Sequence, residues 1–416
     1  MMHLKSFGER MVLDQLSQQR EQNWQSLWNR GLVSLYIILY FLDGVTRYKH
    51  IVSALLYITA ITYIVKHRGA IITLFKNNLT TALLVFLAAI IYSIIISIDP
   101  GYSVDKAANS VFEKLVVIAL IIPIVLFNES KEDVARTFIY ALIIAIIPLA
   151  IADLFQYIDE YHRGIMPFTR FEHKYKSDAL IFMSPALLYL WTLKGYRNKA
   201  IFFALGIITA LMIIGTMQRG TWLAILVMSV VWAIVKREWK LPALALAAVA
   251  LFFTASHHYD PGHFAKLFNK MQQTSSSGRY GNGTQGSAVD LIMENPVKGY
   301  GFGDDIFYRV YNERIKDYPQ WIFKKAIGPH NLTLATWYAA GIFGLVALWY
   351  LLISLGREAV RGYQRSDEVI RNAWLTLGLI LLGNLIVRGA FETVNISNLG
   401  VLLGIALALR AKQKQV

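Results

Sequence analysis

The sequence contains no cysteine, which removes several kinds of chemistry at once. Without thiols the chain forms no disulfide, has no thiolate nucleophile and offers no cysteine ligand to zinc or to an iron–sulfur cluster. Charged residues are also scarce, at 16% of the chain, and 27 acidic residues stand against 41 lysines and arginines. The formal net charge of +14 therefore favours anionic partners.

The N-terminal segment lacks the apolar core that a secretory signal peptide requires. Residues 1–31 are polar and of mixed charge, with Arg10, Glu21 and Arg30 among them. We therefore predict no cleaved signal peptide and assign residues 1–31 to a cytoplasmic lead-in.

Long apolar runs dominate the rest of the chain, which is 56% apolar overall. A run of about 20 apolar residues crosses a membrane as a helix, because a helix satisfies its own backbone hydrogen bonds in lipid. We therefore predict an all-α, polytopic membrane protein with about 12 transmembrane helices. The candidate spans cover residues 32–46, 51–65, 80–98, 113–127, 135–157, 178–193, 199–216, 220–235, 241–256, 331–355, 370–388 and 394–411.

These spans divide the chain after the lead-in into three parts. Spans 1–9 occupy residues 32–256, a long connector occupies 257–329, and spans 10–12 with a short cytoplasmic tail occupy 330–416. Basic clusters fall on alternate connectors, which by the positive-inside rule puts both chain ends in the cytoplasm and the 257–329 connector outside. The clusters are Lys66/Arg68/Lys76, Lys194/Arg197/Lys199, Lys236/Arg237/Lys240, Arg357/Arg361/Arg365 and Arg410/Lys412/Lys414.

The long connector carries the most varied chemistry in the chain. At roughly seventy residues it exceeds an ordinary loop, and we expect it to pack on the helix ends and cover a cavity. Helices are predicted over 263–271 and 285–294, and the second ends because Pro296 cannot continue it. Gly299, Gly301 and Gly303 resemble a dinucleotide-binding fingerprint, but no strand precedes them, so a tight turn is the better interpretation.

One histidine is the best candidate for acid–base chemistry. His330 follows Pro329 and precedes Asn331, a good capping residue, so its imidazole is expected at the positive end of the tenth span. That position disfavours imidazolium, and a neutral imidazole can take a proton from a sugar hydroxyl as a general base. The alternative is a capping role or a polar side chain at the level of the lipid headgroups.

Two arginines are suited to binding a pyrophosphate. Arg219 lies between the seventh and eighth spans, and Arg279 follows Ser277 and Gly278 in a turn of small residues. Each guanidinium is a permanently charged, planar fork of donors that matches phosphate oxygens. A snorkelling boundary charge remains the alternative for Arg219, and a solvated loop residue the alternative for Arg279.

Further candidate contacts to a substrate or acceptor lie mostly on the outer connectors, where basic residues favour phosphorylated partners. Arg388 stands four residues before Glu392, a spacing that allows an ion pair, so structural support is favoured for it over substrate contact. The full set of these candidates is Arg163, Arg170, Lys174, Arg314, Arg388 and Asn331.

The carboxylates of the connector form no metal-binding pattern. Asp304 and Asp305 are adjacent and therefore point in different directions, and Glu313 follows at no spacing typical of a metal site. We predict neither a metal nor another cofactor. Nucleic acid is also a poor partner, because the basic residues are split between two faces of a membrane.

The motifs around these residues resemble the O-antigen ligase family, the lipopolysaccharide ligases, whose superfamily includes O-antigen polymerases and protein O-oligosaccharyltransferases. By motif the resemblance covers about residues 200–350. It rests on His330-Asn331 followed after nine residues by Gly341-x-x-Gly344, on Ser277-Gly278-Arg279 followed by Glu294-Asn295-Pro296, and on Arg219.

The resemblance implies a GT-C-type, metal-independent, inverting glycosyltransferase of the Gram-negative inner membrane, with its active site facing the periplasm. Its donor would be a glycan on undecaprenyl pyrophosphate, and its acceptor the lipid A-core oligosaccharide of lipopolysaccharide. By this resemblance Arg219 and Arg279 bind the donor pyrophosphate, while His330 deprotonates the acceptor hydroxyl. An O-antigen polymerase or a protein O-oligosaccharyltransferase remains an alternative.

A secondary transporter is the alternative from a different class, since it also has many spans and boundary charges. Transporters place such groups near the middle of the bilayer, whereas Arg219, Arg279, His330 and Arg388 all map to one edge. The sequence leaves open whether Arg219, Arg279 and His330 meet in space.

Overall fold

A computed structural model of the chain describes residues 23–165, 172–259, 262 and 277–411, which form helices and loops with no strand among them. The all-α prediction is thereby confirmed for these residues. After a first helix over residues 23–40, the elements are α2 (Thr46–Leu74), α3 (Asn78–Ile95), α4 (Pro100–Ala107), η1 (Ala108–Val117), α5 (Ile118–Val125), α6 (Lys131–His162), η2 (Glu172–Lys176), α7 (Ser177–Thr192), α8 (Tyr196–Gly215), α9 (Arg219–Lys236), α10 (Lys240–Tyr259), α12 (Ser277–Tyr280), α13 (Thr284–Glu294), α14 (Asp304–Arg314), α15 (Leu332–Arg365), α16 (Glu368–Ile380), η4 (Leu381–Val387), η5 (Arg388–Ala390) and α17 (Asn398–Arg410).

Eight helices of the described part are long and apolar enough to cross a membrane. They are α2, α3, the continuous stretch Pro100–Val125, α6, α8, α9, α15 and the stretch Glu368–Ala390. All twelve predicted spans coincide largely with helices, but α7 has 16 residues and α17 has 13, which is short for a membrane crossing. Eight spans are therefore supported by length and composition, and about 12 remains a prediction.

Side-chain caps fix the starts of several long helices, so these boundaries follow from the local sequence. Asn77 accepts hydrogen bonds from the backbone N–H groups of Leu79 and Thr80 at the start of α3, each at 3.0 Å. Asn331 accepts one from Leu334 at 3.0 Å at the start of α15. Such caps satisfy N–H groups that the first helical turn leaves without a partner.

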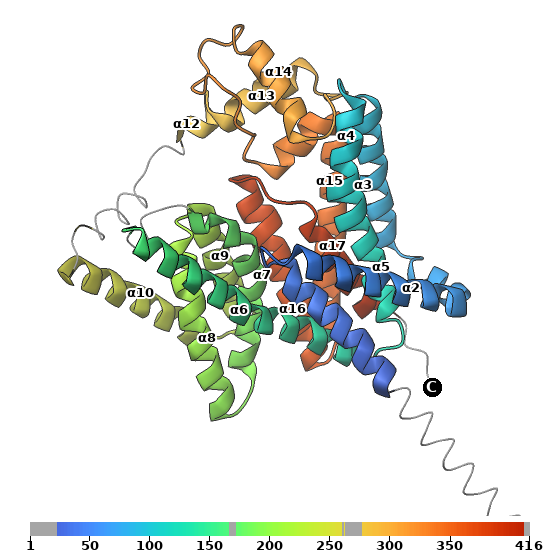
Figure 1. Cartoon of the computed structure of the whole chain (residues 1–416), viewed down its shortest axis with the longest axis vertical. Coiled ribbons are helices and arrows are strands. Elements are labelled where there is room, and N and C mark those ends of the chain that lie inside the picture. Colours follow the sequence, from blue (N-terminus) through green and yellow to red (C-terminus); the bar gives the residue numbers. More distant parts are fainter. Residues whose placement is uncertain (1–22, 166–171, 260–261, 263–276, 412–416) are drawn as a thin grey trace, which may run out of the picture.

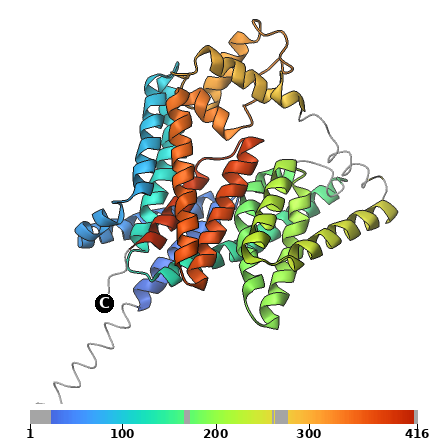
Figure 2. The same ribbon diagram turned by 180° about the vertical axis from the view of Figure 1, so that it is seen from behind.

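The connector helices α12, α13 and α14 lie together at one end of the molecule, over the start of α15 (Figure 1). The helix α3 packs along α15, as the opposite view shows (Figure 2). A separate aromatic core holds the connector together and includes Phe307, Tyr311, Trp321 and Tyr338, the last of which belongs to α15. The predicted helix over 285–294 corresponds to α13, whereas the one over 263–271 lies outside the described residues.

The turn that contains Gly299, Gly301 and Gly303 is hydrogen-bonded to α15 at a kink in that helix. The N–H groups of Tyr300 and Gly301 donate to the carbonyls of Tyr338 at 2.9 Å and Ala339 at 3.0 Å. Helical geometry fails at the next two residues, and Gly341 has φ +60°. The glycine series is therefore a docking turn against α15, in agreement with the rejection of a dinucleotide fingerprint.

Substituting Gly341 with alanine is expected to destabilise the protein and loosen the connector. A Cβ at this position would overlap the carbonyl oxygen of Val297, and an L residue at positive φ costs about 1–3 kcal/mol before that clash. The matched control is Gly356→Ala in the same helix, where the nearest atom would be Leu381 Cδ2 at 3.6 Å. Thermal unfolding of the purified variants checks this, and equal melting temperatures would contradict the docking role.

Candidate functional site

His330 lies immediately before α15, between the connector and the membrane-spanning candidates. Its φ is +49°, a left-handed backbone conformation that is uncommon outside glycine. The side chain is half-buried, and the next residue, Asn331, caps the helix as predicted. Backbone strain of this kind is found most often at functional sites, so the geometry is consistent with a role beyond capping.

The surroundings of His330 favour its neutral form. Burial lowers the pKa of the imidazole, and the positive charges of Arg279 and Lys174 lower it further. The sequence predicted a neutral imidazole from its position at the helix end alone. The lowered pKa agrees with that prediction, but burial and two neighbouring cations are its causes. Both cations come from other parts of the chain, the connector and η2, so the structure brings three predicted site residues together.

Arg279 and His330 are fixed to the same turn, which follows η5. The guanidinium of Arg279 donates to the carbonyl of Phe391 at 2.9 Å. Gln285 donates to the carbonyls of His330 at 3.2 Å and Ala390 at 2.9 Å. The amide of Asn331 donates to the same Ala390 carbonyl at 3.1 Å. Ala390 and Phe391 therefore hold the backbone around His330, through Gln285 and Asn331, and the guanidinium of Arg279.

Arg388 stabilises this turn from within the protein. It is 6% exposed and forms ion pairs with Asp178 of α7 and, at 3.3 Å, with Glu392. Asn384 accepts a further hydrogen bond at 3.3 Å. The predicted pair with Glu392 is present, although the chain turns after Ala390 and the pair is not part of a regular helix. Three acceptors on a buried guanidinium fit structural support.

The start of α9, which carries Arg219, contacts the same turn. A Cβ on Gly220 would lie 2.7 Å from Oε1 of Glu392, so the two segments touch. The side chain of Gln218 accepts a hydrogen bond from the buried Ser177 hydroxyl at 2.6 Å. Ser177 and Asp178, in the first turn of α7, thus bind the side chain of Gln218, next to Arg219, and the side chain of Arg388.

Two of the arginines predicted to contact the substrate form ion pairs with acidic residues of the protein. Arg163 pairs with Asp159 at 2.7 Å on the surface, and Arg314 pairs with Glu294 at 3.1 Å on the connector. No described contact joins either of them to His330. Arg170 lies outside the described residues.

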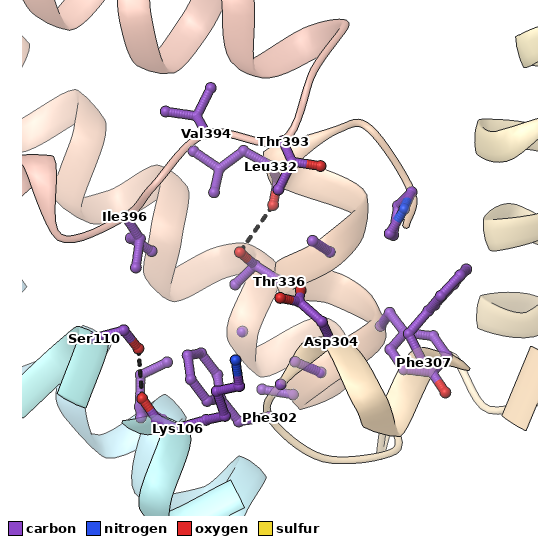
Figure 3. A pocket seen from close by; sticks show the side chains of 18 of the residues that line it. Lys106, Ser110, Phe302, Asp304, Phe307, Leu332, Thr336, Thr393, Val394 and Ile396 are labelled. Atoms are coloured by element: carbon purple, nitrogen blue, oxygen red, sulfur yellow. Dashed lines mark hydrogen bonds between the residues drawn. The ribbon is translucent and has the colours of Figure 1, made fainter. Parts of the chain in front are cut away.

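His330 lines a cavity of about 380 Å³ beneath the connector, together with Asp304, Tyr308 and Thr393. Asp304 and Thr393 also line a neighbouring, mostly apolar cavity of about 410 Å³ between α14, α15 and the segment 393–396. Figure 3 shows Asp304 and Thr336 of α15 among the side chains that line this second cavity. Connector residues therefore form part of the walls of both cavities, and the expectation that the connector covers a cavity stays a prediction.

A family model described as O-antigen ligase matches residues 203–349 of the chain. The O-antigen ligase of Salmonella typhimurium (strain LT2) is 42% identical over 396 residues, which cover 94% of this chain and 97% of that protein. The chain belongs to the O-antigen ligase family. The matched segment runs from within α8 to within α15 and contains Arg219, Arg279 and His330.

One feature of this O-antigen ligase family member was missed in the sequence. Asp153 and Glu160 of α6 hold His173 between them, with oxygen–nitrogen distances of 2.6 and 3.1 Å, and Lys176 also binds Asp153. All four side chains are buried. The signal was the polar stripe at positions 153, 156, 157 and 160 inside an apolar run, a spacing that places these residues on one helix face.

This cluster positions η2, which leads into the first turn of α7. Among the described residues, no group of three or more histidines, aspartates or glutamates is arranged to hold a metal ion. Ion pairing and ring stacking on Tyr157, with centroids 3.9 Å apart, account for the cluster.

Proposed function

We propose that the protein is an O-antigen ligase that transfers a glycan from undecaprenyl pyrophosphate to the lipid A-core oligosaccharide, at the periplasmic face of the inner membrane. The observation that carries the proposal is His330 in a cavity lined by connector residues, with a lowered pKa and Arg279 as a charged neighbour. Membership of the O-antigen ligase family supports the same reaction class.

In the proposed reaction, Nδ1 or Nε2 of His330 takes the proton from an acceptor hydroxyl as its oxygen attacks the anomeric carbon of the donor. The bond from that carbon to the pyrophosphate oxygen breaks, and its electron pair leaves with the pyrophosphate. Arg279 and Arg219 stabilise the negative charge that develops there, which fixed cationic donors in a water-poor site do effectively. Attack from the opposite face inverts the anomeric configuration.

One assay separates this function from its alternatives. The purified protein is given a lipid-linked glycan together with lipid A-core, and products are resolved by gel electrophoresis. A ligase produces glycan-capped lipopolysaccharide, whereas a polymerase lengthens the donor without an acceptor and a protein O-oligosaccharyltransferase requires a protein acceptor. A transporter forms no new glycosidic bond, so absence of any transfer product would refute the proposal.

The ligation rate is expected to stay high somewhat below pH 6.5, the ordinary pKa of histidine, and to decline only at lower pH. The base must be neutral, so kcat/KM falls as pH drops through the His330 pKa, which lies below its ordinary value. Lys174→Gln removes a cation that lowers this pKa, so this acidic limb of the profile should move toward higher pH. The shift should be small, because Lys174 is exposed and screened.

The matched control for this profile is Lys316→Gln, an exposed lysine beyond the end of α14. Profiles of kcat/KM against pH should coincide for this control and the wild type. An acidic limb that stays in place in Lys174→Gln at low ionic strength would contradict the electrostatic coupling to His330.

A further inference from the structure

A third cavity, of about 520 Å³, lies between the first helix, α2, η1, α7 and the segment 395–398. It adjoins the apolar cavity and, through it, leads to the His330 cavity. It shares Asp178 and Asn395 with the apolar cavity, which in turn shares Asp304 and Thr393 with the His330 cavity. The three cavities therefore follow one another from His330 into the helix bundle.

The walls of this third cavity combine aromatic rings with hydrogen-bonding groups. Tyrosines line it from several elements, and carboxylate, amide and hydroxyl groups stand between them. A sugar ring has an apolar face that can stack on an aromatic ring, and hydroxyl groups at its edge that donate and accept hydrogen bonds. Walls of this composition therefore match a sugar. The polar and aromatic lining includes Tyr36, Tyr40, Tyr57, Tyr175, Asn109 and Glu113.

The lining carries no excess of positive charge, which disfavours a phosphate and fits a neutral ligand. Asp43, Glu113 and Asp178 contribute three carboxylates, of which Asp178 is paired with Arg388, and Lys49 and Lys114 contribute two ammonium groups. A phosphate site would carry an excess of cations, as the surroundings of His330 do. The lining therefore fits hydroxyl groups better than phosphate oxygens.

One buried amide in the wall has an unused donor. Asn398 is 2% exposed, and its side-chain oxygen accepts a hydrogen bond from the Tyr40 hydroxyl at 3.0 Å. Its nitrogen has no hydrogen-bond partner among the described residues. A buried donor without an acceptor is costly, so this amide is a polar group of the wall whose hydrogen bonds within the protein are incomplete.

We propose that this third cavity binds a neutral sugar of the acceptor oligosaccharide, whose attacking hydroxyl lies farther along at His330. The proposal rests on the proposed ligase function. The acceptor is favoured over the donor because the row of adjoining cavities begins at His330, the proposed base for the acceptor hydroxyl. Arg219 and Arg279, which are assigned to the donor pyrophosphate, line none of the three cavities. Polar groups that face a cavity inside a membrane protein commonly mark a substrate path.

The test is a double variant, Asn109→Ala with Glu113→Gln, assayed as the full-length protein. Both side chains are exposed to the cavity and lie outside the hydrophobic core, so folding should be retained. The KM for lipid A-core should rise about tenfold, as expected for losing hydrogen bonds to a bound sugar, with kcat and the donor KM unchanged. Asp105→Asn, one turn before Asn109 and outside all three cavities, is the matched control and should behave as wild type.

A second measurement separates failure of this site from failure of the ligase function. Saturation-transfer NMR with delipidated core oligosaccharide should detect binding to the wild type and to the inactive His330→Ala protein, but weaker binding to the double variant. A rise in the donor KM instead would assign the cavity to the donor glycan and overturn the proposal, and so would unchanged values for both substrates. If the wild type makes no capped lipopolysaccharide, the ligase function itself fails, whatever the NMR shows.

Discussion

Replacing His330 with alanine is expected to lower kcat for glycan transfer by a factor of about 10²–10⁴, the usual contribution of a general base. The backbone carbonyl of His330 still accepts the Gln285 hydrogen bond in this variant, so the local frame is kept. Arg279 also keeps its bond to the Phe391 carbonyl. The loss should therefore appear in kcat rather than in the affinity for the lipid-linked donor.

The backbone at position 330 requires its own control, because alanine is also strained at a φ of +49°. His330→Asn removes the base but introduces a residue that tolerates the left-handed region better. Both variants should be inactive, while the asparagine variant should keep the wild-type melting temperature. Wild-type turnover by either protein would eliminate His330 as the base.

Much of the fold follows from local sequence. Each apolar run became a helix, because a chain in lipid has few other ways to satisfy its backbone, and the caps at Asn77 and Asn331 set two helix starts. The boundaries of the helices do not all follow in the same way. Glu113 and Lys114 lie within a continuous helical stretch, Pro100–Val125, that begins well before its apolar run. Hydropathy alone therefore misplaced that boundary.

The site shows a similar division between local and long-range information. Residue type and position were enough to propose His330, Arg219 and Arg279 as candidates and to predict the pair of Arg388 with Glu392, which the structure contains. The contacts that assemble the site are distant in sequence. Arg279 binds a carbonyl 112 residues away, and Arg388 binds Asp178 at a separation of 210 residues. Periodicity and motifs carry no information about such pairs, so the role of the turn after η5 emerged only in three dimensions.

Changing Arg279 to lysine is expected to reduce kcat/KM for the lipid-linked donor by a factor of about 10–100, although the charge is retained. One nitrogen of Arg279 is engaged by the Phe391 carbonyl, which orients the rest of the planar guanidinium. A single ammonium cannot hold that carbonyl and also offer a parallel pair of donors to a pyrophosphate. Arg279→Ala removes the charge as well and should cost about 10²–10³.

The matched control for this charge-preserving change is Arg136→Lys on α6, whose exposed side chain pairs with Glu132 one turn earlier in the same helix. Donor and acceptor kinetics measured on the three proteins, with melting temperatures as a check of folding, decide the role of Arg279. The defect should be confined to the donor, since the acceptor is assigned to the cavities that begin at His330. If Arg279→Lys retained full donor efficiency, a fork-shaped contact to the pyrophosphate would be untenable, and only a general cationic effect on the His330 pKa would remain for Arg279.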